Sequence, residues 1–204
     1  MGSKKESFFW TSYSDLMTSL FFVMLVLFVL TIALLHKRMV ATQEQLDKIK
    51  QMQKATEKID PNYFAYDQTF KRHTLKNIVI SFRTQSADMT DIDEDTQKKL
   101  LNAGKSIRNF MLSAQKQLPE ANYLLIIEGQ SSKDNYKKNF ELSYERALHL
   151  VQFWDNNNIS FDNMKNCELL ISGSGYSSKF RAAKNKDNQR FVIHVIPKPC
   201  DFSN

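Results

Sequence analysis

The sequence predicts a single-pass membrane helix followed by an α/β domain, in which strands and helices follow one another as β-α-β-α-β-β around a mixed sheet. Residues 16–35 form an apolar run without a charged side chain, long enough to cross a bilayer. From residue 75 onward, short apolar runs typical of buried strands alternate with segments of helical periodicity. The chain has five glycines and four prolines in 204 residues, which excludes a fibrous or low-complexity protein.

The membrane helix is expected over residues 8–35, after a short tail of residues 1–7. These 28 residues contain one charged side chain, Asp15, and as a helix they would be about 42 Å long, more than the roughly 30 Å of a hydrocarbon core. A cleaved signal peptide fits less well, because the apolar run is too long and no small-x-small cleavage site follows it. Basic residues flank the run on both sides, so charge alone does not set its orientation.

Residues 36–60 are polar, rich in Gln and Lys, and predicted to be a helical linker. Apolar side chains recur at Met39, Leu46, Ile49 and Ile59, which favours a helix that continues from the membrane segment. A solvated linker without fixed structure is the alternative. Pro61 ends this stretch.

The α/β domain is expected over residues 61–204. Strands are predicted at 77–82, 123–128, 168–172 and 190–196, and helices at 93–118 and 140–156. Pro119 breaks the first helix, and Gly129 opens a polar loop after the second strand. The two helices should cover one face of the sheet.

Asp15 is the first residue that points to a function. An ionisable side chain at mid-bilayer costs at least about 2.5–3.5 kcal/mol on insertion scales, so its default interpretation is functional. The alternative is that Asp15 lies about 10 Å inside the helix start and reaches the interface.

The sequence around Asp15 resembles the start of MotB-type stator subunits. Residues 9–18 read F-W-T-S-Y-S-D-L-M-T, and in that family an aromatic-rich approach is followed by a small residue, Asp, an apolar residue, Met and Thr. The resemblance implies that Asp15 carries an ion, proton or sodium, in a motor made of five channel-forming subunits around two MotB-type subunits. Thr18 and Ser19 lie one turn further on as possible hydroxyl ligands, unless they bond back to helix carbonyls.

The domain is similar to OmpA-like peptidoglycan-binding domains over about residues 75–197. Residues 139–147 match the family signature N-x-x-L-S-x-x-R-A, and I-E-G-Q-S-S at 127–132 stands where the family has an apolar strand leading into G-H-T-D. The later G-x-G and R-x-V elements also match, at Gly173 and Arg190. The family fold is β-α-β-α-β-β, which agrees with the pattern of elements predicted above.

The OmpA-like resemblance implies a peptidoglycan site at Arg146 and Asn139. Family members hold diaminopimelate through the Arg of the signature and the Asp of G-H-T-D. A guanidinium suits a carboxylate bidentately, whereas the family Asp is replaced here by Ser131 or Ser132, and the nearest carboxylate is Asp134. Peptidoglycan affinity is therefore expected to be weak, altered or absent. A salt bridge within the domain is the alternative role for Arg146.

The remaining composition excludes several function classes. The net charge of +6 is spread along the chain, without the basic stripe and interleaved aromatics of a nucleic-acid-binding protein. Four His and two Cys show no metal-ligand spacing, and no nucleophile–base pair or Gly-rich phosphate loop occurs. We therefore expect no enzyme, no metal and no cofactor. Cys167 and Cys200 either form a disulfide, which an extracytoplasmic compartment permits, or are two free thiols.

Together the two resemblances imply a motor subunit in the bacterial inner membrane, with a cytoplasmic N-terminus, a periplasmic domain anchored to peptidoglycan, and a homodimer inside a pentamer of MotA-like channel subunits. Residues 9–18 look closer to the B subunit of Zorya anti-phage defence motors, where F-W-x-S-Y-A-D-L-M-T is typical, than to flagellar MotB. A passive cell-wall anchor without ion transport and a TonB- or Tol-type energiser are the rivals.

Overall fold

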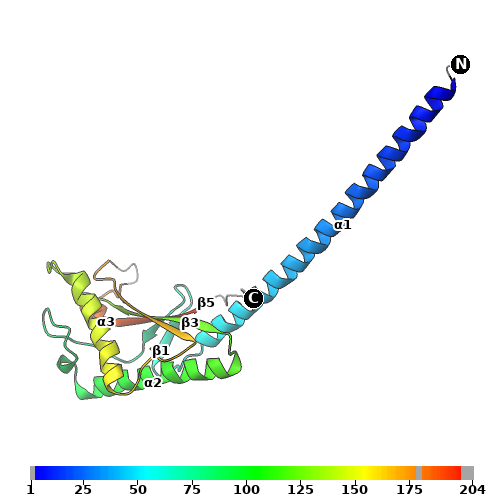
Figure 1. The fold of residues 1–204 in the computed structure, drawn as a ribbon. Helices are drawn as coiled ribbons and strands as arrows, with labels where there is room; N and C mark the ends of the chain where they lie inside the picture. The colour runs from blue at the N-terminus through cyan, green and yellow to red at the C-terminus, as the bar shows by residue number, and fades with distance from the viewer. Residues whose placement is uncertain (1–2, 178–180, 199–204) are drawn as a thin grey trace. The chain divides into compact units, whose positions relative to one another are not determined.

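The computed structural model describes residues 3–177 and 181–198, and the chain divides into two compact units, residues 1–48 and 49–204. Helix α1 (Ser3–Thr56) supplies all of the first unit that is described and the beginning of the second (Figure 1). It contains no Gly or Pro, and the Lys, Gln, Glu and Ala residues after the apolar run are good helix formers. Among the described residues, one helix, over Trp10–Thr56, is long and apolar enough to cross a membrane by length and composition.

The second unit is built on a five-stranded mixed sheet in the order β1-β2-β5-β3-β4. The strands are β1 (Phe64–Asp67), β2 (Arg72–Leu75), β3 (Asn122–Gly129), β4 (Cys167–Gly173) and β5 (Phe191–Lys198). Strands β3 and β4 are parallel, with Gly129 opposite Gly173, and every other neighbouring pair is antiparallel. The predicted fold class, an apolar N-terminal helix followed by an α/β domain with a mixed sheet, is confirmed.

Two long helices pack on one face of this sheet (Figure 1). Helix α2 (Glu94–Gln117) begins after Asp93, whose carboxylate accepts a hydrogen bond from the Thr96 backbone N–H, and it ends just before Pro119. Helix α3 (Asn139–Asn156) follows the loop after β3. Side chains on the helix-covered face of β3 include Tyr123, which packs on Phe110 of α2, and Gly129 faces α3 from the same side.

The last turns of α1 belong to the hydrophobic core of the second unit. Met52 is 2% exposed and packs in the same cluster as Ile59 and Phe64. The imidazole Nε2 of His73 on β2 lies 2.9 Å from the carbonyl oxygen of Thr56, the last residue of the helix. Burial lowers the pKa of His73, so the ring stays neutral at neutral pH. Side-chain packing and one buried hydrogen bond therefore fix the end of α1 to the domain.

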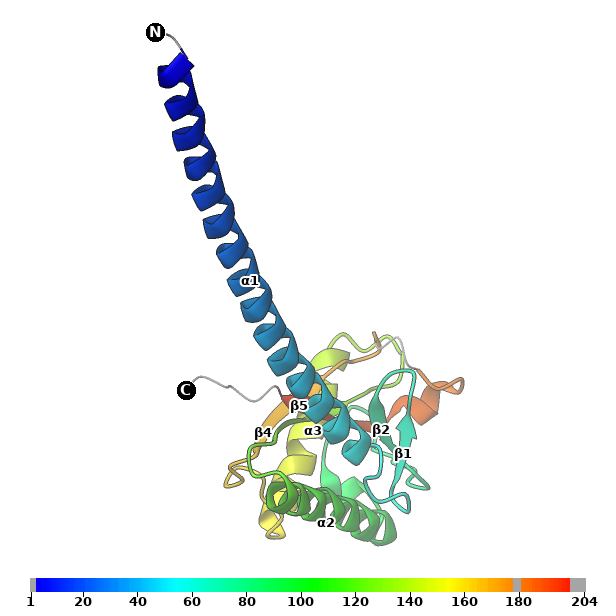
Figure 2. The ribbon, with the colours of Figure 1, turned by 90° about the vertical axis from the view of Figure 1, so that its right-hand side faces the viewer.

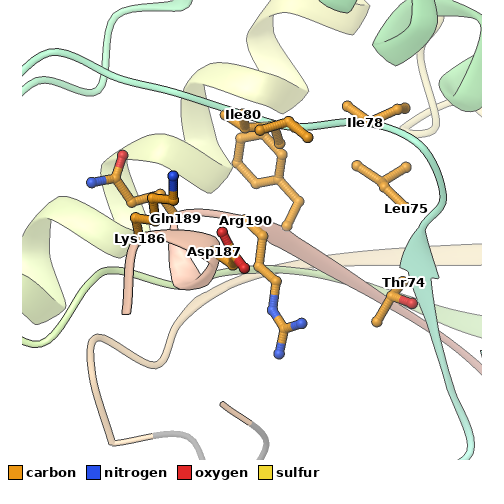
Figure 3. A pocket seen from close by; sticks show the side chains of 10 residues that line it. Thr74, Leu75, Ile78, Ile80, Lys186, Asp187, Gln189 and Arg190 are labelled. Carbon is orange, nitrogen blue, oxygen red and sulfur yellow. The ribbon is translucent and has the colours of Figure 1, made fainter. Parts of the chain in front are cut away.

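The strand predicted at 77–82 is wrong, because these residues form no regular secondary structure and pair with no strand in the described part of the chain. Asn77 has a φ of 57°, which turns the chain away from the end of β2. Alternation persists, since Ile80 is buried and Val79 is exposed, and this alternation produced the prediction. A hollow of about 200 Å³ lies between this segment and the chain just before β5. Figure 3 shows side chains that line it, among them Ile78, Ile80 and Arg190.

The edge position is taken instead by a hairpin that the sequence analysis did not predict. Strands β1 and β2 lie side by side at one edge of the sheet (Figure 2). The turn between them is fixed by the Asp67 carboxylate, which accepts hydrogen bonds from the backbone N–H groups of Thr69 and Phe70. Lys71 completes the turn with a φ of 49°. Each strand has four residues, too few for a clear periodic pattern.

Candidate functional site

In the apolar helix, Asp15, Thr18 and Ser19 lie on one face, because residues three and four positions apart are neighbours on a helix. The Thr18 hydroxyl donates a hydrogen bond to the Ser14 carbonyl at 2.6 Å, and the Ser19 hydroxyl donates to the Leu16 carbonyl at 2.9 Å. Both hydroxyls therefore bond back to helix carbonyls, which was the alternative to a role as free ion ligands. Each hydroxyl oxygen keeps lone pairs that can accept a hydrogen bond or contact a cation beside the Asp15 carboxylate.

In the domain, the signature residues at the start of α3 hold the loop that precedes the helix. Asn139 is 1% exposed, and its side-chain amide donates hydrogen bonds to the Asp134 carboxylate at 2.7 Å and to the Tyr136 carbonyl at 2.9 Å. The Asn139 carbonyl accepts a hydrogen bond from the Ser131 hydroxyl. Asn139 thus makes its hydrogen bonds within the protein. It would affect a ligand indirectly, by fixing the conformation of the loop before α3.

Arg146 lies two turns further along α3 and is 3% exposed. Its guanidinium carbon lies 4.3 Å from the centre of the Phe82 ring, and its Nε donates to the Ser86 carbonyl at 3.0 Å. Burial lowers the pKa of Arg146 to about 10, against the opposing effects of the Asp134 and Asp91 carboxylates, so the side chain is still charged at neutral pH. The sequence analysis did not identify Phe82 and Ser86 as the platform for this guanidinium.

Asp134 is the carboxylate that the structure places in electrostatic range of Arg146. Hydrogen bonds from the Asn139 amide and the Tyr136 backbone N–H, aided by the charge of Arg146, hold the pKa of Asp134 below its usual range. Ser131 is buried, with its hydroxyl directed at a carbonyl oxygen, so a carboxylate at that position would meet an acceptor. Ser132 is half-buried and accepts a hydrogen bond from the Gln189 amide. Of the residues predicted for the peptidoglycan site, the structure brings Arg146, Asp134 and Asn139 close to one another.

Two glycines allow α3 to lie close to the sheet. A Cβ added at Gly129 would overlap the carbonyl oxygen of Ser143, and one at Gly173 would overlap the Ser143 hydroxyl and the backbone of Tyr144. The Ser143 hydroxyl donates to the Phe140 carbonyl and accepts a hydrogen bond from the Gly175 backbone N–H at 2.9 Å. These glycines and the small Ser143 therefore set the distance between Arg146 and the loops at the ends of β3 and β4.

A polar network on the opposite face of the sheet was not predicted. Glu128 accepts hydrogen bonds from the Gln130 amide at 3.0 Å and the Ser174 hydroxyl at 2.6 Å, and it pairs with His194 at 2.9 Å. Burial opposes ionisation of Glu128, but these hydrogen bonds outweigh it and lower its pKa to about 2. The Arg190 Nε donates to the side-chain amide oxygen Oε1 of Gln130 at 3.0 Å. The network joins β3 and β5 to the loop after β4, and it includes Gln130, the residue that follows β3.

In the described part of the chain, no cluster of three or more His, Cys, Asp or Glu side chains that could hold a metal ion occurs. Burial raises the pKa of the Cys167 thiol to about 11. Its predicted disulfide partner, Cys200, lies outside the described residues, so the pairing stays a prediction. The His149 Nδ1 lies 2.7 Å from the Ala87 carbonyl oxygen, so this ring makes a contact inside the domain.

Comparison with known proteins gives similarity to solved structures. No family model matches the sequence, and no curated protein matches it. A MotB-like protein from Desulfovibrio vulgaris is 12% identical with a TM-score of 0.45 and covers 76% of this chain and 96% of its own. The periplasmic domain of Helicobacter pylori MotB is 13% identical with a TM-score of 0.41, covering 70% and 92%. The OmpA-like domain of FopA1 from Francisella tularensis is 18% identical with a TM-score of 0.37, covering 60% and 72%.

Proposed function

We propose that this chain is the single-pass, cell-wall-anchored subunit of an ion-driven membrane motor of the stator type. The observation that carries the proposal is Asp15, a carboxylate inside an apolar run and within the F-W-T-S-Y-S-D-L-M-T stretch of residues 9–18. An anchor without transport has no use for a carboxylate in its membrane helix. A proton or sodium ion passing through a channel-forming partner binds Asp15, with the Thr18 hydroxyl beside it.

The domain is the anchor of this proposed motor. Arg146 provides a planar, permanently charged group for a carboxylate of the peptidoglycan stem, and Asp134 provides the carboxylate for an ammonium group. This assignment places the N-terminus in the cytoplasm and the domain in the periplasm of a bacterial inner-membrane protein. Two copies of the chain stand inside a pentamer of MotA-like subunits, as the resemblance to stator subunits implies.

The biological setting that we propose is a Zorya-type anti-phage defence motor, with a flagellar MotB-like stator as the second candidate. The F-W-x-S-Y pattern before Asp15 favours the defence system. The two settings are separated by two assays on cells that carry the chain with its native partners. Defence function predicts a change in plaque formation on phage challenge, and flagellar function predicts a change in swimming.

The proposal is tested by Asp15→Asn, which preserves size and hydrogen bonding but removes the titratable charge. We expect loss of the ion-driven phenotype, whether phage protection or motility, with normal membrane level and normal co-purification of the channel subunit. The matched control is Asp47→Asn, which removes a carboxylate from the same helix beyond the apolar run. Full activity of the Asp15→Asn protein would reject transport and leave the passive anchor.

A further inference from the structure

We propose that a second binding site, for an acidic saccharide, lies between α2 and the end of α3. The ligand class is a sugar with one carboxylate and several hydroxyl groups. The site is a hollow of about 480 Å³ whose polar lining comes from α2, the last turns of α3 and the loop that follows. The polar side chains that matter for recognition are Arg108, Gln115, Asp155, Asn158, Ser160 and Asn163.

Among the described residues, the guanidinium of Arg108 has neither a hydrogen-bond partner nor an ion-pair partner. Its Nε is buried and makes no hydrogen bond, and in residues 3–177 and 181–198 Arg108 forms no ion pair. By contrast, Arg146 and Arg181 each donate to a backbone carbonyl. A half-buried charge without a compensating anion is unfavourable. The terminal nitrogens of the Arg108 guanidinium can bind a carboxylate through two parallel hydrogen bonds. A carboxylate bound in the hollow would satisfy this group.

The charge balance of the hollow selects a singly charged anion. Its lining includes two cations, Arg108 and Lys165, and one anion, Asp155, which leaves one positive charge. Asp155 makes no ion pair with Arg108 within the described residues, so both remain available to a ligand. A carboxylate on the ligand matches the net charge, while the Asp155 carboxylate accepts hydrogen bonds from hydroxyl groups.

The other polar side chains suit hydroxyl groups. Gln115, Asn158 and Asn163 carry amides that both donate and accept, and in the described part of the chain none of these side chains forms a hydrogen bond. The loop that presents two of them is held firmly. Backbone N–H groups of Asn158 and Ile159 donate to the Asp155 and Trp154 carbonyls, and the Phe161 ring packs on Trp154. The hollow is therefore largely preformed, which lowers the entropic cost of binding.

This hollow is separate from the Arg146 site. Asp155 follows Arg146 by nine residues on α3, a distance of about 13 Å along the helix axis. Arg108 belongs to α2, whereas the platform of Arg146 is formed by Phe82 and Ser86. The proposed saccharide site thus does not depend on the wall-anchoring role of Arg146.

The test is binding of glucuronate to the full chain in detergent micelles, measured by saturation-transfer NMR. We expect saturable binding that weakens by about tenfold or more in Arg108→Gln. Lys105→Gln removes the same charge from an exposed position on the same helix and should bind like the unmodified chain. Glucose, which lacks the carboxylate, should bind at least about tenfold more weakly than glucuronate. Arg146→Lys should leave glucuronate binding unchanged.

Three results would overturn the proposal: no saturable glucuronate binding, equal binding by Arg108→Gln, or equal affinity for glucose. If Arg108→Gln does not fold, Asn163→Ala replaces it, because Asn163 is exposed and its loss leaves the core intact. Weaker binding by Asn163→Ala supports the site, and unchanged binding rejects it. Loss of sacculus binding in an Arg146 variant with glucuronate binding retained would separate this site from the proposed anchor.

Discussion

Arg146 is enclosed by Phe82 and the Ser86 carbonyl, so its substitution tests recognition and packing at the same time. Arg146→Lys keeps the positive charge but removes the planar fork and most of the ring stacking. We expect sedimentation with cell-wall sacculi to fall by about tenfold while the melting temperature falls by only about 2–6 °C. Arg83→Lys, the same change at an exposed arginine, is the control. A large loss of stability with unchanged sedimentation would make Arg146 structural.

Glu128 predicts a dependence of stability on pH. Its pKa is about 2 in the folded protein, below the ordinary value of 4.5, so its stabilising effect is complete above about pH 4.5 and is lost as the pH falls toward 2. After allowance for solvent screening, we expect it to contribute about 2 kcal/mol to the free energy of unfolding at neutral pH. Denaturant titrations of the original chain and Glu128→Gln should therefore differ at pH 6 and differ much less near pH 2.5. An equal difference at both pH values would contradict this account.

At the scale of elements, the end of α1 is part of the domain core. Met52→Ala removes a side chain that is 2% exposed, and we expect the free energy of unfolding of the domain to fall by about 2–4 kcal/mol. Met39→Ala, on the same helix at a side chain that is 63% exposed, should have almost no effect. Denaturant unfolding followed by tryptophan fluorescence measures both, because Trp154 lies in the same core. Equal effects would show that α1 is not packed there.

Most elements were predictable because their periodicity and their end signals agree. Asp93 and Pro119 bracket α2, and the apolar run of β3 ends at Gly129. The segment at 77–82 has the alternation of a strand, but the backbone of Asn77 turns it out of the sheet, and such a turn has no signal in a pattern of apolar residues. The strands of the β1–β2 hairpin have four residues each, which is too short for a recognisable alternation of apolar and polar residues.

The candidate site was predictable where a motif is local and not where the fold brings distant segments together. Arg146 and Asn139 lie within nine residues of one another in a signature. The Arg146 Nε bonds a carbonyl 60 residues earlier, and Glu128 pairs with His194, which lies 66 residues later. Those contacts depend on the strand order of the sheet, in which β5 lies between β2 and β3. Hydroxyl back-bonding at Thr18, being local, was anticipated as an alternative.

At the scale of the whole molecule, the proposed motor requires two copies of the chain. Single cysteines at Val40 or Gln43, on the exposed surface of α1 just past the apolar run, should cross-link to their counterparts in intact membranes. Cys167 and Cys200 are first replaced by Ser. Ala41→Cys, rotated by about 100° around the helix, should cross-link less. Native mass spectrometry that finds one copy per complex would reject the dimer.

The hydrogen bond between His73 and Thr56 provides a natural reporter for the end of α1. A carbonyl has no proton to give, so the neutral ring must carry its hydrogen on Nε2, and within the described residues the buried Nδ1 has no hydrogen-bond partner. A ring proton shielded in this way exchanges slowly with water and gives its own resonance in a proton NMR spectrum. When the helix end leaves the domain, that resonance should disappear while the signals of the strand core persist. Isotope labelling of histidine alone would therefore show whether the helix end separates from the domain.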